Sequence, residues 1–259
     1  GGTVVRESDN INAYLVAAPN VAVTTRSKPS DDRAQMQFGN HPYYGSALIF
    51  SHQEGRELVE AHPTAAKFVR PLYGSKEFIS AAPRACLWIE AKNLGEAETI
   101  PPIAEKLAEV EKARRSAKRD QAAQKLAETP YRFRDQATAE NSVMAVPRIS
   151  SENRQYLPVG VLPGAAIIQD QAFALYDPPL WNMAIIGSRL HLVWVGAVCG
   201  KLETRFRYSN TLGWNTFPVP KLTEKNKEDL TRCAEDILLA REAHFPATIA
   251  DLYDPEKMP

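Results

Sequence analysis

The chain has 259 residues, 44% of them hydrophobic and 24% charged, and its 31 basic residues balance its 31 acidic residues. This length allows one large core or two smaller ones. The zero net charge argues against a histone-like binder of polyanions, although a DNA reader could still gather positive charge on one face. No apolar run is long enough to cross a bilayer, and the N-terminus lacks the order of a signal peptide, so we expect a cytoplasmic protein without membrane partners.

The three cysteines, Cys86, Cys199 and Cys233, lie far apart and form no paired C-x-x-C motif. Their odd number and spacing indicate neither a disulfide framework nor a zinc site. We therefore expect all three to pack as small apolar residues.

The first hundred residues predict short strands and one helix. Residues 11–25 read as a β-hairpin that turns at Ala18-Pro19-Asn20. A short strand is predicted over 46–50, a helix over 51–62 that ends before Pro63, and a buried strand over 83–89.

Pro101 and Pro102 open the longest helical stretch, an insertion over about 101–128, because proline is tolerated in the first turn of a helix. Apolar residues mark one face of it at helical spacing. Its second half is the most basic part of the chain and faces few acids. Such an arm could follow DNA phosphates, but a solvated helix or helical hairpin whose outside is covered by Lys and Arg is an equal alternative.

The second half of the chain returns to strands. They are predicted over 143–149, 156–162, 165–168 and 172–176, followed by a buried helix over 185–199 that ends at Gly200 as a left-handed cap, and by a last helix capped by Thr223. Because strands and helices do not alternate in regular βαβ units, we predict an α+β fold. It would have mixed, mainly antiparallel sheets, a long helical spacer and a C-terminal helix.

Residues 201–209 read as one strand, with charged side chains on one face and apolar side chains on the other. The charged face carries Glu203, Arg205 and Arg207. Arginine can donate to both major-groove acceptors of guanine, and glutamate can accept from the amino group of cytosine, so this face could read base pairs. A solvated face of cross-strand ion pairs is the alternative.

Catalytic motifs are missing from the sequence. It contains no glycine-rich nucleotide loop, no G-x-S-x-G, no H-E-x-x-H, and no nucleophile with an orienting acid beside His191 or His244. Asp177-Pro178-Pro179-Leu180 is close to the motif with which amino-group DNA methyltransferases hold a flipped base, but Leu180 lacks the stacking ring. We read it as a proline-fixed loop, and expect no catalytic residue, metal site or cofactor in this chain.

Several blocks together resemble the MmeI-like bacterial DNA methyltransferases, and they occur in the family's order over nearly the whole chain. They are residues 38–42, 69–78, 83–88, 146–158, 188–194, 200–209 and 215–218.

The resemblance implies a division of labour. In that family one polypeptide carries an N6-adenine methyltransferase domain, often after an endonuclease domain, and then a target recognition domain. Residues 3–220 would be this last domain and residues 221–259 the start of a truncated C-terminal helical segment. S-adenosylmethionine, and Mg²⁺ where a nuclease is present, would bind upstream. The partners would be double-stranded DNA and the upstream methyltransferase domain, in the bacterial cytoplasm.

The resemblance also implies where DNA is contacted. Base reading would fall to Glu203, Arg205 and Arg207, joined by Arg148, Asp170 and Gln171. Phosphate contacts are assigned to Arg154, Arg115, Lys118 and Arg119. Two other interpretations stay open: a separate specificity subunit that acts in trans, and a protein-interaction domain whose basic arm binds acidic partners.

Overall fold

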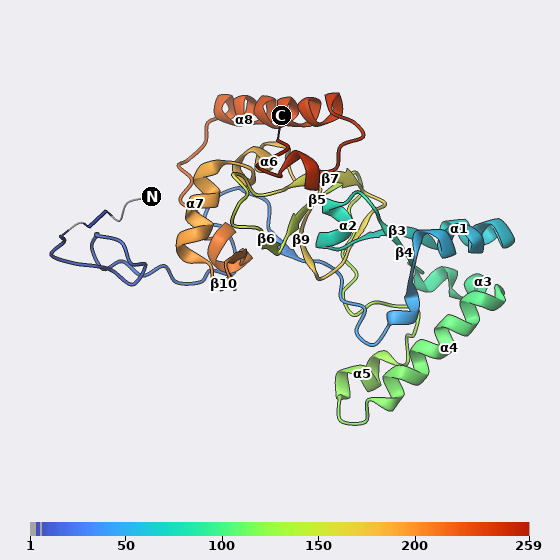
Figure 1. The fold of residues 1–259 in the computed structure, drawn as a ribbon. Helices are drawn as coiled ribbons and strands as arrows, with labels where there is room; N and C mark the ends of the chain where they lie inside the picture. The colour runs from blue at the N-terminus through green and yellow to red at the C-terminus, as the bar shows by residue number, and fades with distance from the viewer. Residues whose placement is uncertain (1–3, 6, 259) are drawn as a thin grey trace.

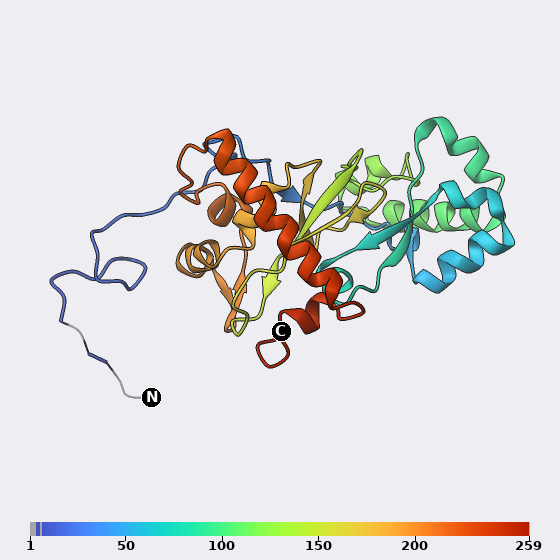
Figure 2. The same ribbon diagram turned by 90° about the horizontal axis from the view of Figure 1, so that it is seen from above.

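The computed structural model describes residues 4, 5 and 7–258, and it confirms the α+β fold with mostly antiparallel strands. Three sheets lie between a long helix, α8 (Glu224–Ala243), on one side of the molecule and a helical hairpin that projects from the other side (Figure 1). Figure 2 shows α8 crossing above the sheets.

The central sheet is antiparallel, in the order β1-β9-β5-β7. Its strands are β1 (Gln37–Phe38), β9 (Ala172–Tyr176), β5 (Ser142–Pro147) and β7 (Gly160–Pro163). Alternating residues of β5 and β9 face two different cores. The larger ones, such as Met144 and Phe173, pack toward the C-terminal helices, and the smaller ones, such as Ala145, pack toward Phe78.

The second sheet has the order β2-β4-β3-β8. It consists of β2 (Ile49–Phe50), β4 (Arg84–Leu87), β3 (Val69–Tyr73) and β8 (Ile167–Ile168), of which β3 and β8 pair in parallel. The 3₁₀ segments η1 (Ser46–Leu48) and η2 (Pro63–Lys67) and the helices α1 (His52–Ala61) and α2 (Ser75–Ile79) join these strands. Since β8 runs into β9 through the turn 169–171, this turn connects the two sheets.

The helical insertion consists of η3 (Ala91–Asn93), α3 (Leu94–Glu98), α4 (Pro101–Ser116) and α5 (Gln121–Leu126). Ile103, Leu107 and Val110 are buried against the second sheet, as their helical spacing predicts. α4 and α5 form a hairpin whose basic residues are mostly exposed.

Arg114 departs from the solvated basic arm that the sequence suggests. It is fully buried, and its guanidinium donates hydrogen bonds to five backbone carbonyl oxygens. Burial lowers the pKa of Arg114 to about 10, so the group remains charged at neutral pH. The bonds reach across three segments, with acceptors in Pro42, Tyr43, Leu126, Thr129 and Arg132.

The third sheet is small, with β10 (Lys201–Leu202), β11 (Arg205–Arg207) and β6 (Ile149–Ser150). Around it lie α6 (Trp181–Ile186), α7 (Arg189–Val198), the π-helical segment η4 (Asn210–Trp214) and α9 (Ile249–Leu252). α8 begins at the predicted cap Thr223 and packs Leu230, Ala234 and Ile237 into the core that it shares with α6.

The elements predicted over 11–25 and 185–199 are wrong. Residues 11–25 form turns and no strand, because the side chain of Asn12 accepts from the backbone N–H groups of Tyr14 and Val16 and so folds the segment locally. The helix predicted over 185–199 is broken at Gly187 and Ser188, where the Ser188 hydroxyl caps α7.

Two smaller predictions also fail. Gly200 is not a left-handed cap, since no glycine of the described residues has a positive φ. Cys233 is exposed on α8, whereas Cys86 and Cys199 are buried as predicted. Ala234 lies on the apolar face of α8 and packs in the core, whereas the neighbouring Cys233 lies on the exposed face of the helix.

The buried guanidinium of Arg114 leads to a stability prediction. Arg114→Met leaves five carbonyl oxygens without their charged donor, and we expect the free energy of unfolding to fall by about 3 kcal/mol or more. Arg115→Met, at the exposed neighbouring position, should change it by less than about 0.5 kcal/mol. Urea unfolding of both variants measures the difference, and equal effects would contradict the structural role of Arg114.

Candidate nucleic-acid interface

Arg148 lies at the point where the chain leaves one sheet for another. The strand predicted over 143–149 is divided there, so that β5 belongs to the central sheet and β6 to the small sheet. The backbone N–H of Arg148 donates to Ser75 Oγ, and its carbonyl accepts from Tyr208 N–H at 2.8 Å. Both peptide groups are thus held, and the side chain is aimed from a fixed backbone.

The guanidinium of Arg148 packs on aromatic rings and reaches the 169–171 turn. Its Cζ lies 4.8 Å from the ring centre of Phe38 and 5.8 Å from that of Phe173, and its Nη1 donates to the carbonyl oxygen of Asp170 at 2.8 Å. Aromatic stacking and one hydrogen bond orient the group while leaving other N–H donors free.

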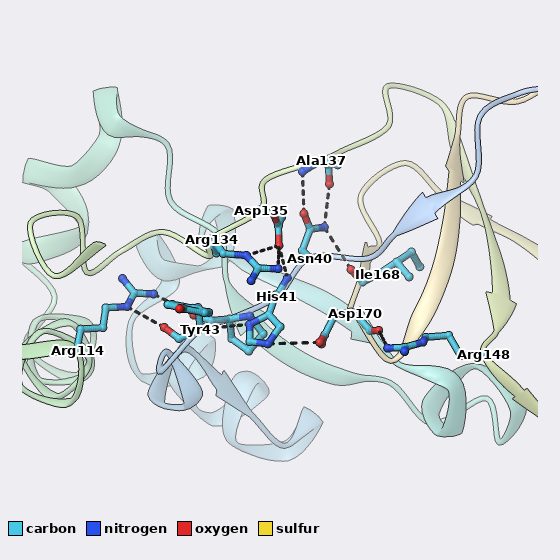
Figure 3. Close-up of polar contacts among 11 residues, drawn as sticks. Asn40, His41, Tyr43, Arg114, Arg134, Asp135, Ala137, Arg148, Ile168 and Asp170 are labelled. Carbon is cyan, nitrogen blue, oxygen red and sulfur yellow. Dashed lines mark hydrogen bonds and ion pairs between the residues drawn. The ribbon is translucent and has the colours of Figure 1, made fainter. Parts of the chain in front are cut away.

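Asp170 and Gln171 occupy the tip of the turn between β8 and β9. Gln171 is exposed, and its carbonyl accepts from the Ser75 hydroxyl. The carboxylate of Asp170 faces His41, with 3.5 Å between Asp170 Oδ2 and His41 Nε2 (Figure 3). The structure therefore brings together Arg148, Asp170 and Gln171, three of the residues predicted to read bases.

Asn40 fixes the segment that carries His41. Its side chain donates to the carbonyl oxygens of Ala137 and Ile168 and accepts from Ala137 N–H, and its backbone N–H donates to Ile168 at 2.7 Å. Gly39 permits this close approach, because a Cβ at that position would lie 2.3 Å from the carbonyl oxygen of Gln169. The 39–41 segment is thus in direct backbone contact with residues 168–170, the end of β8 and the start of the 169–171 turn.

These segments enclose a hollow of about 570 Å³ on the surface. Most of its lining residues are polar or charged, and one guanidinium, that of Arg134, pairs with a carboxylate, that of Asp135. Its residues are Gln37, Phe38, His41, Arg134, Asp135, Gln136, Ala137, Arg148 and Asp170. Figure 3 shows the labelled residues among them approaching one another from the loop after β1, the 134–137 segment, the β8–β9 turn and the junction of β5 and β6.

The single strand predicted over 201–209 is wrong. It is a hairpin, in which Lys201 pairs with Phe206 and Leu202 with Arg205, and Glu203 and Thr204 form the turn. Glu203 has a φ of 58°, a left-handed conformation that ends the extended backbone. Leu202 is exposed instead of packing on a core.

The hairpin nevertheless keeps the three predicted base readers together. Arg205 and Arg207 lie on the same side of β11 and are exposed, and Arg205 Nη2 contacts Glu203 Oε2 at 2.7 Å. Arg207 pairs with Ile149 next to Arg148, so the small sheet connects the hairpin to the hollow. This ion pair joins the turn to β11 and does not cross between strands, so it matches only in part the alternative of a solvated face with cross-strand ion pairs.

The predicted phosphate-binding residues fall in two places. Arg115, Lys118 and Arg119 are exposed near the tip of the α4–α5 hairpin, where Arg115 pairs with Glu111 at 2.7 Å. Arg154 is half-buried in the loop after β6, and burial lowers its pKa. In Figure 1 the α4–α5 tip and the β10–β11 hairpin both lie on the side of the molecule away from α8.

Sequence reasoning missed several residues of the hollow. Phe38, His41, Arg134 and Asp135 line it, although they stand in segments without strand or helix periodicity. The only signal was that Phe38 and His41 fall in one of the family blocks. Their placement depends on the tertiary contact between 39–41 and 168–170.

The residues that could suggest catalysis have structural roles. His191 is fully buried, its Nε2 is 2.9 Å from the Tyr208 hydroxyl, and burial lowers its pKa to about 3. The Asp177 carboxylate accepts from the backbone N–H groups of Glu140, Asn141 and Ser142 and is therefore occupied in fixing a loop. Among the described residues there is no group of metal-binding side chains, and no helix there is long and apolar enough to cross a membrane.

Comparison with known proteins identifies the class. A family model described as "MmeI, target recognition domain" matches residues 17–221. The chain is thus a target recognition domain of the kind found in restriction-modification enzymes. It belongs to the MmeI target recognition domain family, which confirms the resemblance seen in the sequence.

Two larger proteins are similar to this chain. DNA methyltransferase A of Bacillus subtilis (strain 168) is 36% identical over 250 residues, which cover 96% of this chain and 28% of that protein. The structure of the Type IIL restriction-modification enzyme MmeI in complex with DNA superposes with a TM-score of 0.91 and 28% identity, over 100% of this chain and 34% of that chain. The chain spans about a third or less of the length of these relatives.

The contact at Gly39 can be tested directly. We expect Gly39→Ala to lower the free energy of unfolding by about 1 to 3 kcal/mol, because the added Cβ must push the 168–170 turn away. Gly95→Ala is the matched control: its Cβ meets nothing within 4 Å, so the helix propensity of alanine should stabilise the protein by about 0.5 to 1 kcal/mol. Thermal unfolding distinguishes them, and a stabilised Gly39→Ala would show that the two segments do not touch.

Proposed function

We propose that this chain reads the base sequence of duplex DNA for a bacterial adenine-specific methyltransferase of the restriction-modification type. The observation that carries the proposal is the convergence of Arg148 and Asp170 at one hollow, with Gln171 next to Asp170 in the turn and with Arg205 and Arg207 on a hairpin joined to the hollow through β6. These side chains are mounted on strands and a fixed turn, which gives base reading the precision that flexible loops lack.

The hairpin reads bases by exchanging its internal ion pair for contacts with DNA. Arg205 and Glu203 are both exposed, so separating them costs no more than about 1 kcal/mol. On DNA, Arg205 can donate to guanine O6 and N7 while Glu203 accepts from N4 of the paired cytosine. The pair thus suits a C·G base pair, and in free protein each partner holds the other near its working position.

The α4–α5 tip supplies contacts to the DNA backbone. Lys118 and Arg119 are exposed there without an acidic partner in the described part of the chain, whereas Arg115 would have to leave Glu111. The exposed Tyr44 lies beside them at the same tip. Arg154 is a weaker candidate because it is half-buried. These cations fix the register of the duplex, and each phosphate they neutralise adds salt dependence to binding.

The chemistry belongs to another part of the polypeptide. An upstream domain of the same protein would bind S-adenosylmethionine, flip the target adenine and transfer the methyl group to N6; a nuclease domain, where present, would use Mg²⁺. The Asp177-Pro178-Pro179-Leu180 loop does not fit a site for a flipped base, since its carboxylate already accepts three backbone hydrogen bonds. The place of action would be the bacterial cytoplasm, where the chromosome is accessible.

Substitution of Arg205 tests base reading. In the full-length protein we expect Arg205→Ala to cost about 1 to 3 kcal/mol of binding free energy on the cognate site and to relax one base position. Lys118→Ala should instead weaken binding to all sequences equally and reduce the salt slope by about 1. Selection from random duplexes, followed by binding titrations at several salt concentrations, separates the two effects. Uniform loss in Arg205→Ala would make Arg205 a phosphate contact only.

Methyl transfer tests the division of labour. The purified chain with S-adenosylmethionine and mixed-sequence duplex DNA should produce no N6-methyladenine, whereas the full-length protein should produce it at one sequence. Mass spectrometry of digested DNA measures both. Methyladenine formed by the chain alone would overturn the assignment of catalysis to an upstream domain.

A further inference from the structure

His41 and Asp170 form a mixed donor and acceptor pair at the edge of the hollow. They come from segments far apart in the sequence and face each other across 3.5 Å, from His41 Nε2 to Asp170 Oδ2. This separation exceeds the 2.7 to 3.2 Å that is usual for such hydrogen bonds. The side chains are 36% and 25% exposed, so both polar atoms remain accessible to a ligand in the hollow.

The hydrogen bonds around the imidazole fix which nitrogen carries its proton. The backbone N–H of Tyr43 donates to His41 Nδ1 at 2.9 Å, so Nδ1 acts as an acceptor. In a neutral ring the proton must then be on Nε2, the atom that faces Asp170. A doubly protonated ring would set Nδ1–H against Tyr43 N–H. His41 therefore presents an N–H donor and Asp170 presents a carboxylate acceptor.

Both residues are held by their backbones, which keeps the pair in position. His41 N–H donates to Asp135 Oδ2, and His41 carbonyl accepts from Arg134 N–H at 2.9 Å. Asp170 N–H donates to Asn40 at 3.2 Å, and Asp170 carbonyl accepts from Arg148. Two other charged groups of the hollow are engaged with each other, since Arg134 pairs with Asp135 at 3.0 Å.

A donor beside an acceptor is the pattern that a side-chain amide offers to adenine. Asn and Gln recognise adenine by donating to N7 and accepting from the N6 amino group. Guanine shows two acceptors at the same place, so the Asp170 carboxylate would face its O6 without a proton between them. Thymine offers an acceptor and a methyl group, and cytosine offers only a donor. Among the four bases, adenine alone satisfies both atoms.

We infer that His41 and Asp170 together read one adenine of the target site from the major groove, with His41 Nε2–H donating to N7 and Asp170 accepting from N6. This inference rests on the proposed function and makes His41 a specificity-determining residue. The adenine it names is a base that stays in the duplex, distinct from the one that would be methylated.

The test compares base preferences of full-length variants by selection on random duplexes. The wild-type protein should select an A·T pair at one position where His41→Ala and Asp170→Ala both lose preference for adenine, by about 5- to 150-fold, with the other positions unchanged. His41→Gln, which keeps an N–H donor, should retain the preference. His52→Ala, at an exposed position at the start of α1, is the matched control and should match wild type.

A double variant makes the test stricter. In His41→Ala/Asp170→Asn the amide supplies donor and acceptor by itself, so the adenine preference should return. A double variant as relaxed as His41→Ala would overturn the inference, as would unchanged preferences in His41→Ala, a uniform loss of binding, or a shared position that selects G·C. If the wild-type protein showed no sequence preference in this selection, that result would contradict the proposed function itself. Thermal unfolding verifies that each variant is folded.

Discussion

The contact between residues 39–40 and the 168–170 turn is the constraint on which the proposed DNA-binding surface depends. It joins the loop after β1 to the turn that links two sheets, and it allows no side chain at Gly39. The buried side-chain amide of Asn40 donates hydrogen bonds to the carbonyl oxygens of Ile168 and Ala137 and accepts one from Ala137 N–H. These bonds also position the 134–137 segment. An unsatisfied amide or carbonyl in such a buried place would be costly, so these segments are fixed together.

From this contact the polar side chains of the hollow acquire their positions. Arg148 is set by the switch of the chain between two sheets and by stacking on Phe38, and its bond to Asp170 connects β6 to the turn. In the small sheet β6 pairs with β11, which connects this backbone framework to Arg207 and the exposed β10–β11 hairpin. A rigid frame with exposed charged side chains suits the proposed base reading, because such side chains can change while their backbone positions are kept.

Two neighbouring arginines of α4 differ in burial: Arg114 is buried and has a structural role, whereas Arg115 is exposed and is proposed to contact DNA. Arg114 donates to five carbonyl oxygens inside the protein, whereas Arg115 pairs with Glu111, which in the proposed function it would exchange for a phosphate. The balanced total charge of the chain therefore conceals a local excess of accessible cations at the α4–α5 tip. Binding to DNA depends on where cations are exposed, and the net charge does not report this.

Periodicity and capping residues determined much of the fold. The α+β class, the helix opened by Pro101, the strand 172–176 and the helix capped by Thr223 follow from local pattern, because apolar spacing and caps are local properties. The ordered family blocks also determined the family. Local pattern failed at residues 11–25, where the Asn12 side chain competed for the backbone, and over 201–209, where a left-handed Glu203 turned one strand into a hairpin.

Only the tertiary structure decided how the predicted side chains are grouped. Alternation of polar and apolar residues placed Arg205 and Arg207 together, but nothing in the sequence brought Arg148, Asp170 and His41 to one hollow or buried Arg114 among carbonyl oxygens. Decisive contacts in these arrangements, such as His41 with Asp170 and Arg114 with Pro42 and Tyr43, join segments about 70 to 130 residues apart. Such contacts are set by the packing of whole sheets and by the absence of a side chain at Gly39, and no local pattern encodes them.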